Sequence, residues 1–126
     1  MLYSPTALGL VPMNPDDLYN QAFQLRCNGQ YAEAQALLQR LLQIDPNHVN
    51  GRHQMALILG FIGEFDESLA QLDRLAVQFP QNLDVKYDLA MTQMMLGMQD
   101  EACANFNAIL AVDPTHEKAL QQSVYC

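Results

Sequence analysis

The sequence predicts an all-α protein built from antiparallel helix pairs, and three observations lead to this prediction. Three prolines, Pro46, Pro80 and Pro114, each stand 34 residues from the next. Three glycines keep the same step, at Gly29, Gly63 and Gly97. Between these points apolar residues recur at helical spacing. The chain is therefore predicted to hold three copies of one unit, in which the glycine turns a helix back and the proline ends the pair.

The first unit shows how each element is predicted. Asn14 is a suitable N-cap and Pro15 suits the first helical position, so a helix begins there and ends at Gly29. Tyr31 opens a second helix, which the Asp-Pro pair at 45–46 stops. The same pattern, repeated, predicts about seven helices. The parts are an N-terminal tail at 1–14, repeats at 15–48, 49–82 and 83–116, and a C-terminal helix at 117–126.

Residues 1–13 show no periodicity and include two prolines, so a loosely ordered tail is expected. The alternative is a segment that lies on an apolar surface of this molecule or of a neighbouring one.

The chain is acidic, with a formal net charge of −8 and a pI of about 4.5. Such a charge argues against sequence-blind binding of nucleic acid and against anionic lipid, which both need basic patches. Carboxylates in first turns of helices are stabilised by the helix dipole, and this explains much of the acidity. The alternative is a preference for cationic partners. The residues expected in first turns are Asp16, Asp17, Glu33, Asp66, Glu67, Asp84, Asp100, Glu101 and Glu117.

The chain has three cysteines, Cys27, Cys103 and Cys126, an odd number without any metal-binding spacing. A reducing compartment fits this usage best. The first basic residue is Arg26, so the sequence shows no secretory signal, and no apolar stretch has the length of a membrane helix. We therefore predict a cytoplasmic protein without membrane insertion.

The period and the residue pattern resemble the tetratricopeptide repeat (TPR), a 34-residue helix pair. The matching residues are the three prolines, small residues in the first helix of each pair, small residues in the second, and a large residue four positions further on. The last three sets are Ala22, Ala56 and Ala90; Ala34, Ser68 and Ala102; and Leu38, Leu72 and Phe106. The family's tryptophan position departs from the pattern, with Leu18, Arg52 and Lys86, and its tyrosine position holds Leu25, Leu59 and Gln93. The resemblance implies a right-handed superhelix, an α-solenoid.

The resemblance also implies a binding groove on the inner face of the superhelix, lined by first-helix residues. Aromatic and methionine side chains are frequent there, which is typical of a contact surface. The alternative is that they pack on one another. The predicted groove residues are Tyr19, Asn20, Phe23, Arg26, Cys27, Asn50, His53, Gln54, Leu57, Phe61, Asp84, Tyr87, Asp88, Met91, Met94, Met95 and Lys118.

The predicted function is a protein–protein interaction module, an adaptor or scaffold that holds a partner segment in an apolar, partly acidic groove. An apolar segment with a basic residue near Asp84 and Asp88 would fit it. Two alternatives are a chaperone similar to the class II chaperones of type III secretion, and a structural protein that forms homo-oligomers through its repeat ends or its N-terminal tail.

No catalytic motif and no metal-ligand spacing occurs, so neither an enzyme nor a cofactor or metal site is predicted. His48 and His116 share one repeat position between units and are expected to be solvated turn residues.

Overall fold

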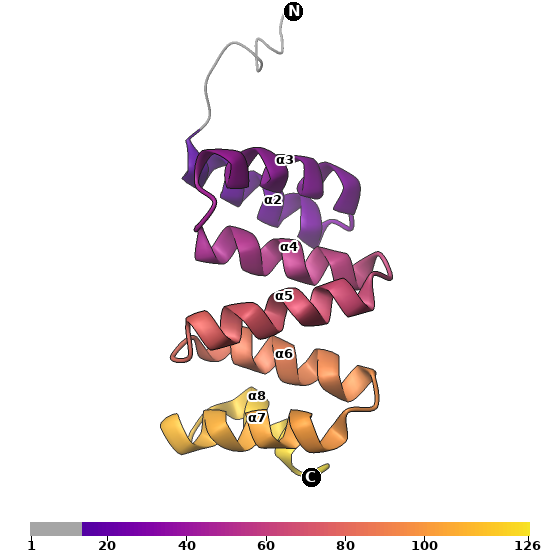
Figure 1. The fold of residues 1–126 in the computed structure, drawn as a ribbon, viewed down its shortest axis with the longest axis vertical. Helices are drawn as coiled ribbons and strands as arrows, with labels where there is room; N and C mark the ends of the chain where they lie inside the picture. The colour runs from indigo at the N-terminus through magenta and orange to yellow at the C-terminus, as the bar shows by residue number, and fades with distance from the viewer. Residues whose placement is uncertain (1–13) are drawn as a thin grey trace, which may run out of the picture. The chain divides into compact units, whose positions relative to one another are not determined.

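The computed structural model describes residues 14–126, so the tail at residues 1–13 lies outside the described part. Every regular element in the described part is an α-helix (Figure 1). The all-α prediction, with about seven helices, is therefore confirmed. The helices are α2 (Pro15–Cys27), α3 (Tyr31–Ile44), α4 (Val49–Phe61), α5 (Phe65–Gln78), α6 (Leu83–Met95), α7 (Gln99–Val112) and α8 (Glu117–Ser123).

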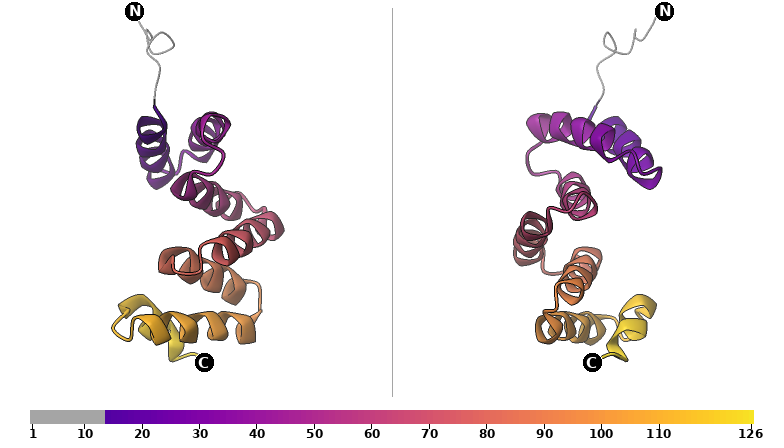
Figure 2. Two further views of the ribbon diagram at one scale, coloured as in Figure 1. Left: turned by 60° about the vertical axis from the view of Figure 1, so that its left-hand side comes forward. Right: turned by 90° about the vertical axis from the view of Figure 1, so that its right-hand side faces the viewer.

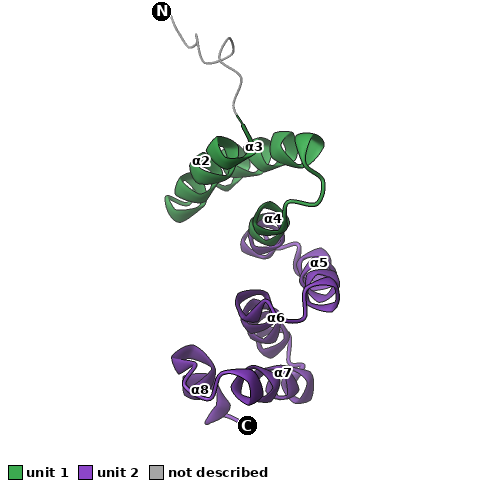
Figure 3. Cartoon of the chain, turned by 90° about the vertical axis from the view of Figure 1, so that its left-hand side faces the viewer, with its two compact units in different colours: residues 1–54 green, residues 55–126 purple. Residues whose placement is uncertain are grey.

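The chain divides into two compact units, residues 1–54 and residues 55–126, and the division falls inside α4 (Figure 3). This division does not follow the predicted repeat boundaries, which stay a prediction. Below, the described residues 14–54 are called the N-terminal unit and residues 55–126 the C-terminal unit.

In the N-terminal unit, α2 and α3 form an antiparallel pair (Figure 2). The helix α2 begins as predicted, because the Asn14 side chain accepts a hydrogen bond of 2.8 Å from the Asp17 amide. The chain reverses at Gly29, whose φ of +78° lies in the left-handed region that favours glycine. Each helix then buries an apolar stripe, Leu18 and Ala22 on α2 and Ala34, Leu38 and Leu41 on α3.

In the C-terminal unit, a cluster of fully buried side chains forms the core around Phe106. Its other members are Ala90, Ala102, Ile109 and Ala119. Since four of the five come from α6 and α7, this antiparallel pair supplies most of the core, and α8 contributes only Ala119. A second cluster joins Ala56, Leu72 and Leu89.

The small and large residues that carry the repeat pattern are all buried, with at most 1% of their surface exposed. Ser68, which replaces an alanine of the pattern, donates a hydrogen bond of 2.7 Å to the Ala56 carbonyl, so its hydroxyl is satisfied. Gln93, which stands at the tyrosine position, is also buried, and its amide oxygen accepts a hydrogen bond of 2.8 Å from Asn105.

The nine acidic residues expected in first turns all occupy first turns, so that prediction is confirmed. The two histidines lie between helices, as predicted, but they are not simply solvated. Their Nδ1 atoms accept backbone hydrogen bonds at helix starts, His48 from Gly51 at 2.8 Å and His116 from Ala119 at 3.1 Å. Both rings are half-buried and lie near tyrosine rings. Because these imidazole nitrogens accept hydrogen bonds from N–H groups in the first turn of a helix, the two histidines are capping residues.

Among the described helices, none is long and apolar enough to cross a membrane.

Candidate functional site

The C-terminal unit contains an apolar pocket of about 470 Å³, formed by α4, α5 and α6. Three of its side chains, Phe61, Phe65 and Met95, are between 40% and 67% exposed, although they are large and apolar. Exposed residues of this kind, gathered around one hollow, mark an interaction site more often than a monomer surface. The lining residues are Leu57, Gly60, Phe61, Phe65, Ser68, Tyr87, Asp88, Met91, Thr92 and Met95.

Six of these lining residues were predicted from the sequence, and four were not. The predicted ones are Leu57, Phe61, Tyr87, Asp88, Met91 and Met95. Phe65 and Ser68 were missed because they belong to α5, a second helix of a pair, and the prediction used first helices alone. Thr92 stands on a first helix at a position outside the set that we predicted, whereas Gly60 shares the repeat position of the predicted Arg26 and Met94 but carries no side chain. The sequence shows an aromatic side chain two residues after Gly63, at the start of a second helix, but no local pattern assigns that position to a groove.

The walls of the pocket offer few polar groups to a ligand. The Ser68 hydroxyl donates to the Ala56 carbonyl, and the Thr92 hydroxyl donates to the Asp88 carbonyl at 2.9 Å. Asp88 is the one carboxylate in the lining, and no lysine or arginine lines the pocket. The pocket is therefore suited to an apolar side chain with a positive charge beside it.

Tyr87 connects this pocket to the core beneath it. Its ring lies 6.0 Å from the Phe106 ring and 6.0 Å from the His116 ring, centre to centre. Burial raises the pKa of the Tyr87 hydroxyl, and the nearby Asp88 carboxylate raises it further. Tyr87 is consequently a neutral, anchored wall of the pocket.

Three other predicted residues of the C-terminal unit do not line this pocket. Met94 packs against the core cluster around Phe106. Asp84 and Lys118 line a separate, polar hollow of about 420 Å³, together with Asp113, Thr115, His116 and Glu117. Lys118 nevertheless contacts one residue of the apolar pocket, because its ammonium lies 5.6 Å from the centre of the Tyr87 ring.

In the N-terminal unit the predicted residues include an aromatic group on α2. The rings of Tyr19 and Phe23 are 6.1 Å apart, and the Arg26 guanidinium lies 5.1 Å from the centre of the Phe23 ring. The centre of the His48 ring lies 5.6 Å from that of Tyr19. Burial raises the pKa of Tyr19, while Arg26 and a hydrogen bond with Gln54 oppose that rise. These contacts show that this group packs partly on itself.

The remaining predicted residues of this unit differ in exposure. Asn20, Cys27 and Asn50 are exposed, and Asn20 lines a shallow hollow of about 340 Å³ with Gln21, Gln24 and Leu25. His53 and Gln54 are buried, with at most 8% of their surface exposed. A groove that runs along all three repeats stays a prediction.

These features define a helical-repeat protein of the α-solenoid class with an exposed apolar pocket. Tetratricopeptide-repeat families match residues 25–81 and residues 84–116. The chain therefore belongs to the tetratricopeptide-repeat family, as its resemblance implied, and this family is a protein-interaction fold. No curated protein is significantly similar to it in sequence.

Solved structures agree with this assignment. YrrB, described as a TPR protein with an unusual peptide-binding site, is 25% identical, with a TM-score of 0.80 over 94% of this chain and 61% of YrrB. MamA from Desulfovibrio magneticus RS-1, solved from residue 41 to its end, is 20% identical, with a TM-score of 0.76 over 89% of this chain and 63% of the solved MamA chain. The chain thus spans less than two thirds of these two structures. PcrH, solved in complex with the chaperone binding region of PopB, is 19% identical, with a TM-score of 0.73 over 88% of this chain and 92% of PcrH.

Proposed function

We propose that the C-terminal unit binds a segment of a partner protein by inserting one apolar side chain of that segment into the pocket of α4, α5 and α6. The observation that carries this proposal is the pocket itself, an apolar hollow with exposed aromatic and methionine side chains at its edge. Methionine adapts to side chains of different shape, so the pocket suits a leucine, methionine or phenylalanine.

The partner segment carries a lysine or arginine close to its apolar residue. Asp88 is the only charge in the pocket lining, and it lies beside the Tyr87 wall. A cation next to the inserted side chain would pair with this carboxylate, whereas an acidic residue would be repelled. The net charge of −8 supports the same preference over longer distances.

The test is direct binding of short fluorescein-labelled peptides to the full chain, measured by fluorescence anisotropy. The peptides carry a central leucine, methionine or phenylalanine and a lysine at different distances from it. Met95→Glu places a carboxylate at the pocket edge, and it should weaken binding at least about tenfold because apolar contact is lost. Met95 is 67% exposed, so the fold should survive.

The matched control is Val77→Glu on α5, because Val77 is 73% exposed and does not line the pocket. It adds the same charge and should leave the affinity unchanged. Asp88→Asn should weaken binding of the lysine peptides, but not of peptides in which leucine replaces the lysine. Equal affinity of Met95→Glu and Val77→Glu for every peptide would contradict the proposal.

A secretion-chaperone role is a second candidate. It is supported by the coverage of PcrH, since this chain spans 92% of that structure. The observation that would favour it is that this chain keeps an apolar secreted segment in solution, and that Met95→Glu abolishes this effect. The third candidate is a structural role as a homo-oligomer. Light scattering that shows a strict monomer at high concentration would exclude it.

A further inference from the structure

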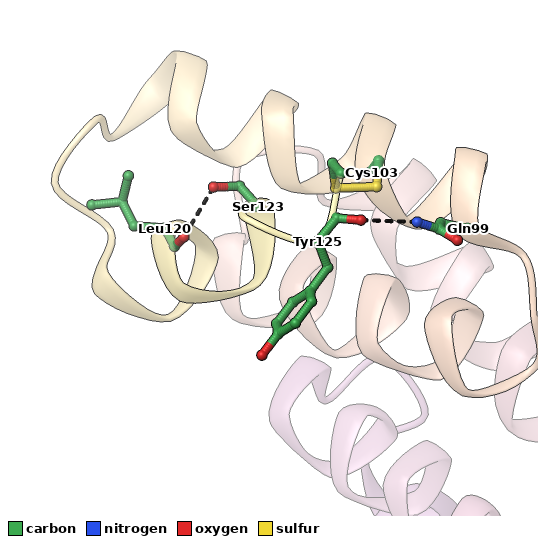
Figure 4. Close-up of a disulfide and its surroundings, with 6 residues drawn as sticks. Gln99, Cys103, Leu120, Ser123 and Tyr125 are labelled. Atoms are coloured by element: carbon green, nitrogen blue, oxygen red, sulfur yellow. Dashed lines mark hydrogen bonds between the residues drawn. A yellow bond between two sulfur atoms is a disulfide. The ribbon is translucent and has the colours of Figure 1, made fainter.

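We propose that Cys103 and Cys126 form a redox-controlled clasp that holds α8 over the core of the C-terminal unit, and thereby supports the wall of the apolar pocket. The structure joins the two sulfur atoms in a disulfide (Figure 4). The odd cysteine number and the absence of a metal spacing led us to expect reduced thiols, and this bond differs from that expectation. Only the tertiary structure brings the two cysteines together, because they are 23 residues apart in sequence.

The helix α8 is short and buries little surface, so a covalent bond to α7 would add to its stability. It has seven residues, far fewer than an isolated helix requires for stability in water. It contributes one fully buried side chain, Ala119, while Leu120 is 44% exposed. The hydrogen bond of 2.9 Å from the Gln99 side chain to the Tyr125 carbonyl, beside the disulfide in Figure 4, holds the same segment to α7.

Two side chains connect this segment to the pocket. His116 precedes α8, caps it at Ala119, and places its ring beside Tyr87. Lys118, on α8 itself, places its ammonium over the Tyr87 ring. Tyr87 lines the pocket, so release of α8 would remove two supports from the pocket wall.

The geometry suits reversible oxidation. The Cα atoms of Cys103 and Cys126 are 5.8 Å apart, a usual separation for a disulfide. Cys126 is exposed and Cys103 is half-buried, so an external disulfide such as oxidised glutathione would meet Cys126 first.

The exchange balances in two steps. The Cys126 thiolate attacks oxidised glutathione, forms a mixed disulfide and releases one glutathione thiolate. The Cys103 thiolate then attacks the Cys126 sulfur, forms the protein disulfide and releases the second glutathione. In total the two cysteines lose two protons and two electrons, and one glutathione disulfide becomes two thiols. Excess reduced glutathione reverses both steps.

The experiment uses the full chain with Cys27→Ser. This substitution removes the free, exposed Cys27, which could otherwise form disulfides between two chains. Oxidised glutathione should lower the mass by two hydrogen atoms and leave no thiol that reacts after denaturation. The amides of Ala119 and Leu120 should then exchange their hydrogens more slowly than in reduced protein, by on the order of 100-fold. In the double variant Cys27→Ser, Cys103→Ser, these amides should exchange as fast as in the reduced protein, with or without oxidised glutathione.

Two results would overturn the proposal. Two reactive thiols after oxidation would show that the bond does not form. A bond that forms without any change in amide exchange would show that it does not hold α8. The link to the pocket has its own readout, because reduction should make the Tyr87 hydroxyl titrate closer to a free tyrosine. An unchanged Tyr87 titration would refute that link, and all these measurements are independent of peptide binding.

Discussion

Replacing Phe106 with alanine should destabilise the chain by about 3–5 kcal/mol, the range for loss of a buried aromatic side chain. Phe106 is the largest fully buried side chain of the described residues, and it lies at the centre of the core cluster of α6, α7 and α8. Its removal creates a cavity whose walls cannot close easily. Three of its four buried neighbours are alanines, whose Cβ atoms are fixed by the helix backbones.

The lost contact with Tyr87 adds to this cost. Their rings lie 6.0 Å apart and are inclined by 58°, a geometry that contributes about 0.5–1.5 kcal/mol in aromatic pairs. Together the two effects place the expected destabilisation in the upper half of the range. Phe106→Leu keeps much of the volume but loses the ring contact, so it should cost less than half as much.

The assay is urea unfolding of the full chain, followed by far-ultraviolet circular dichroism. The control is Val112→Ala on the same helix, where the side chain is 67% exposed and the expected change is within about 0.5 kcal/mol. The reasoning is refuted if Phe106→Ala costs less than about 1 kcal/mol, because the cluster would then not act as a core.

Two further predictions follow from local contacts. Asn14→Ala should lower the free energy of unfolding in urea by about 1 kcal/mol, because the Asp17 amide loses its acceptor. Asn20 is an exposed asparagine in the middle of α2, and Asn20→Ala should change stability far less. Equal costs would show that Asn14 does not cap the helix. In alkaline solution, Tyr87 and Tyr19 should release their protons later than free tyrosine, because burial raises both pKa values above their ordinary value of 10.0. Because the folded-state pKa of each tyrosine is raised, the stability that its buried neutral hydroxyl contributes is complete below a pH of about 10. It is lost as the pH rises through the folded-state pKa. Phenolate absorbance should show a late component that diminishes in Tyr87→Phe and in Tyr19→Phe, and an unchanged titration in both variants would contradict the assignment.

The regular spacing of the repeats explains why part of the pocket lining could be predicted from the sequence. In every copy the small residues face the partner helix, and this places the residues on the opposite side of the first helix at repeated positions. Leu57, Tyr87 and Met91 could be assigned to the pocket for that reason. Phe65 and Ser68 could not, because their part in the lining depends on how the start of α5 lies against α6.

The sequence by itself determined the helices, their turns and their pairing. A glycine and a proline at one constant period, with apolar residues at helical spacing, leave one arrangement for each pair, because these signals act within a few residues. The tertiary structure alone decided which long-range contacts form: the disulfide of Cys103 with Cys126, the tyrosine contacts of His48 and His116, and the closure of the pocket. The physical reason is that these contacts depend on side-chain direction and depth between segments distant in sequence, which no local pattern records.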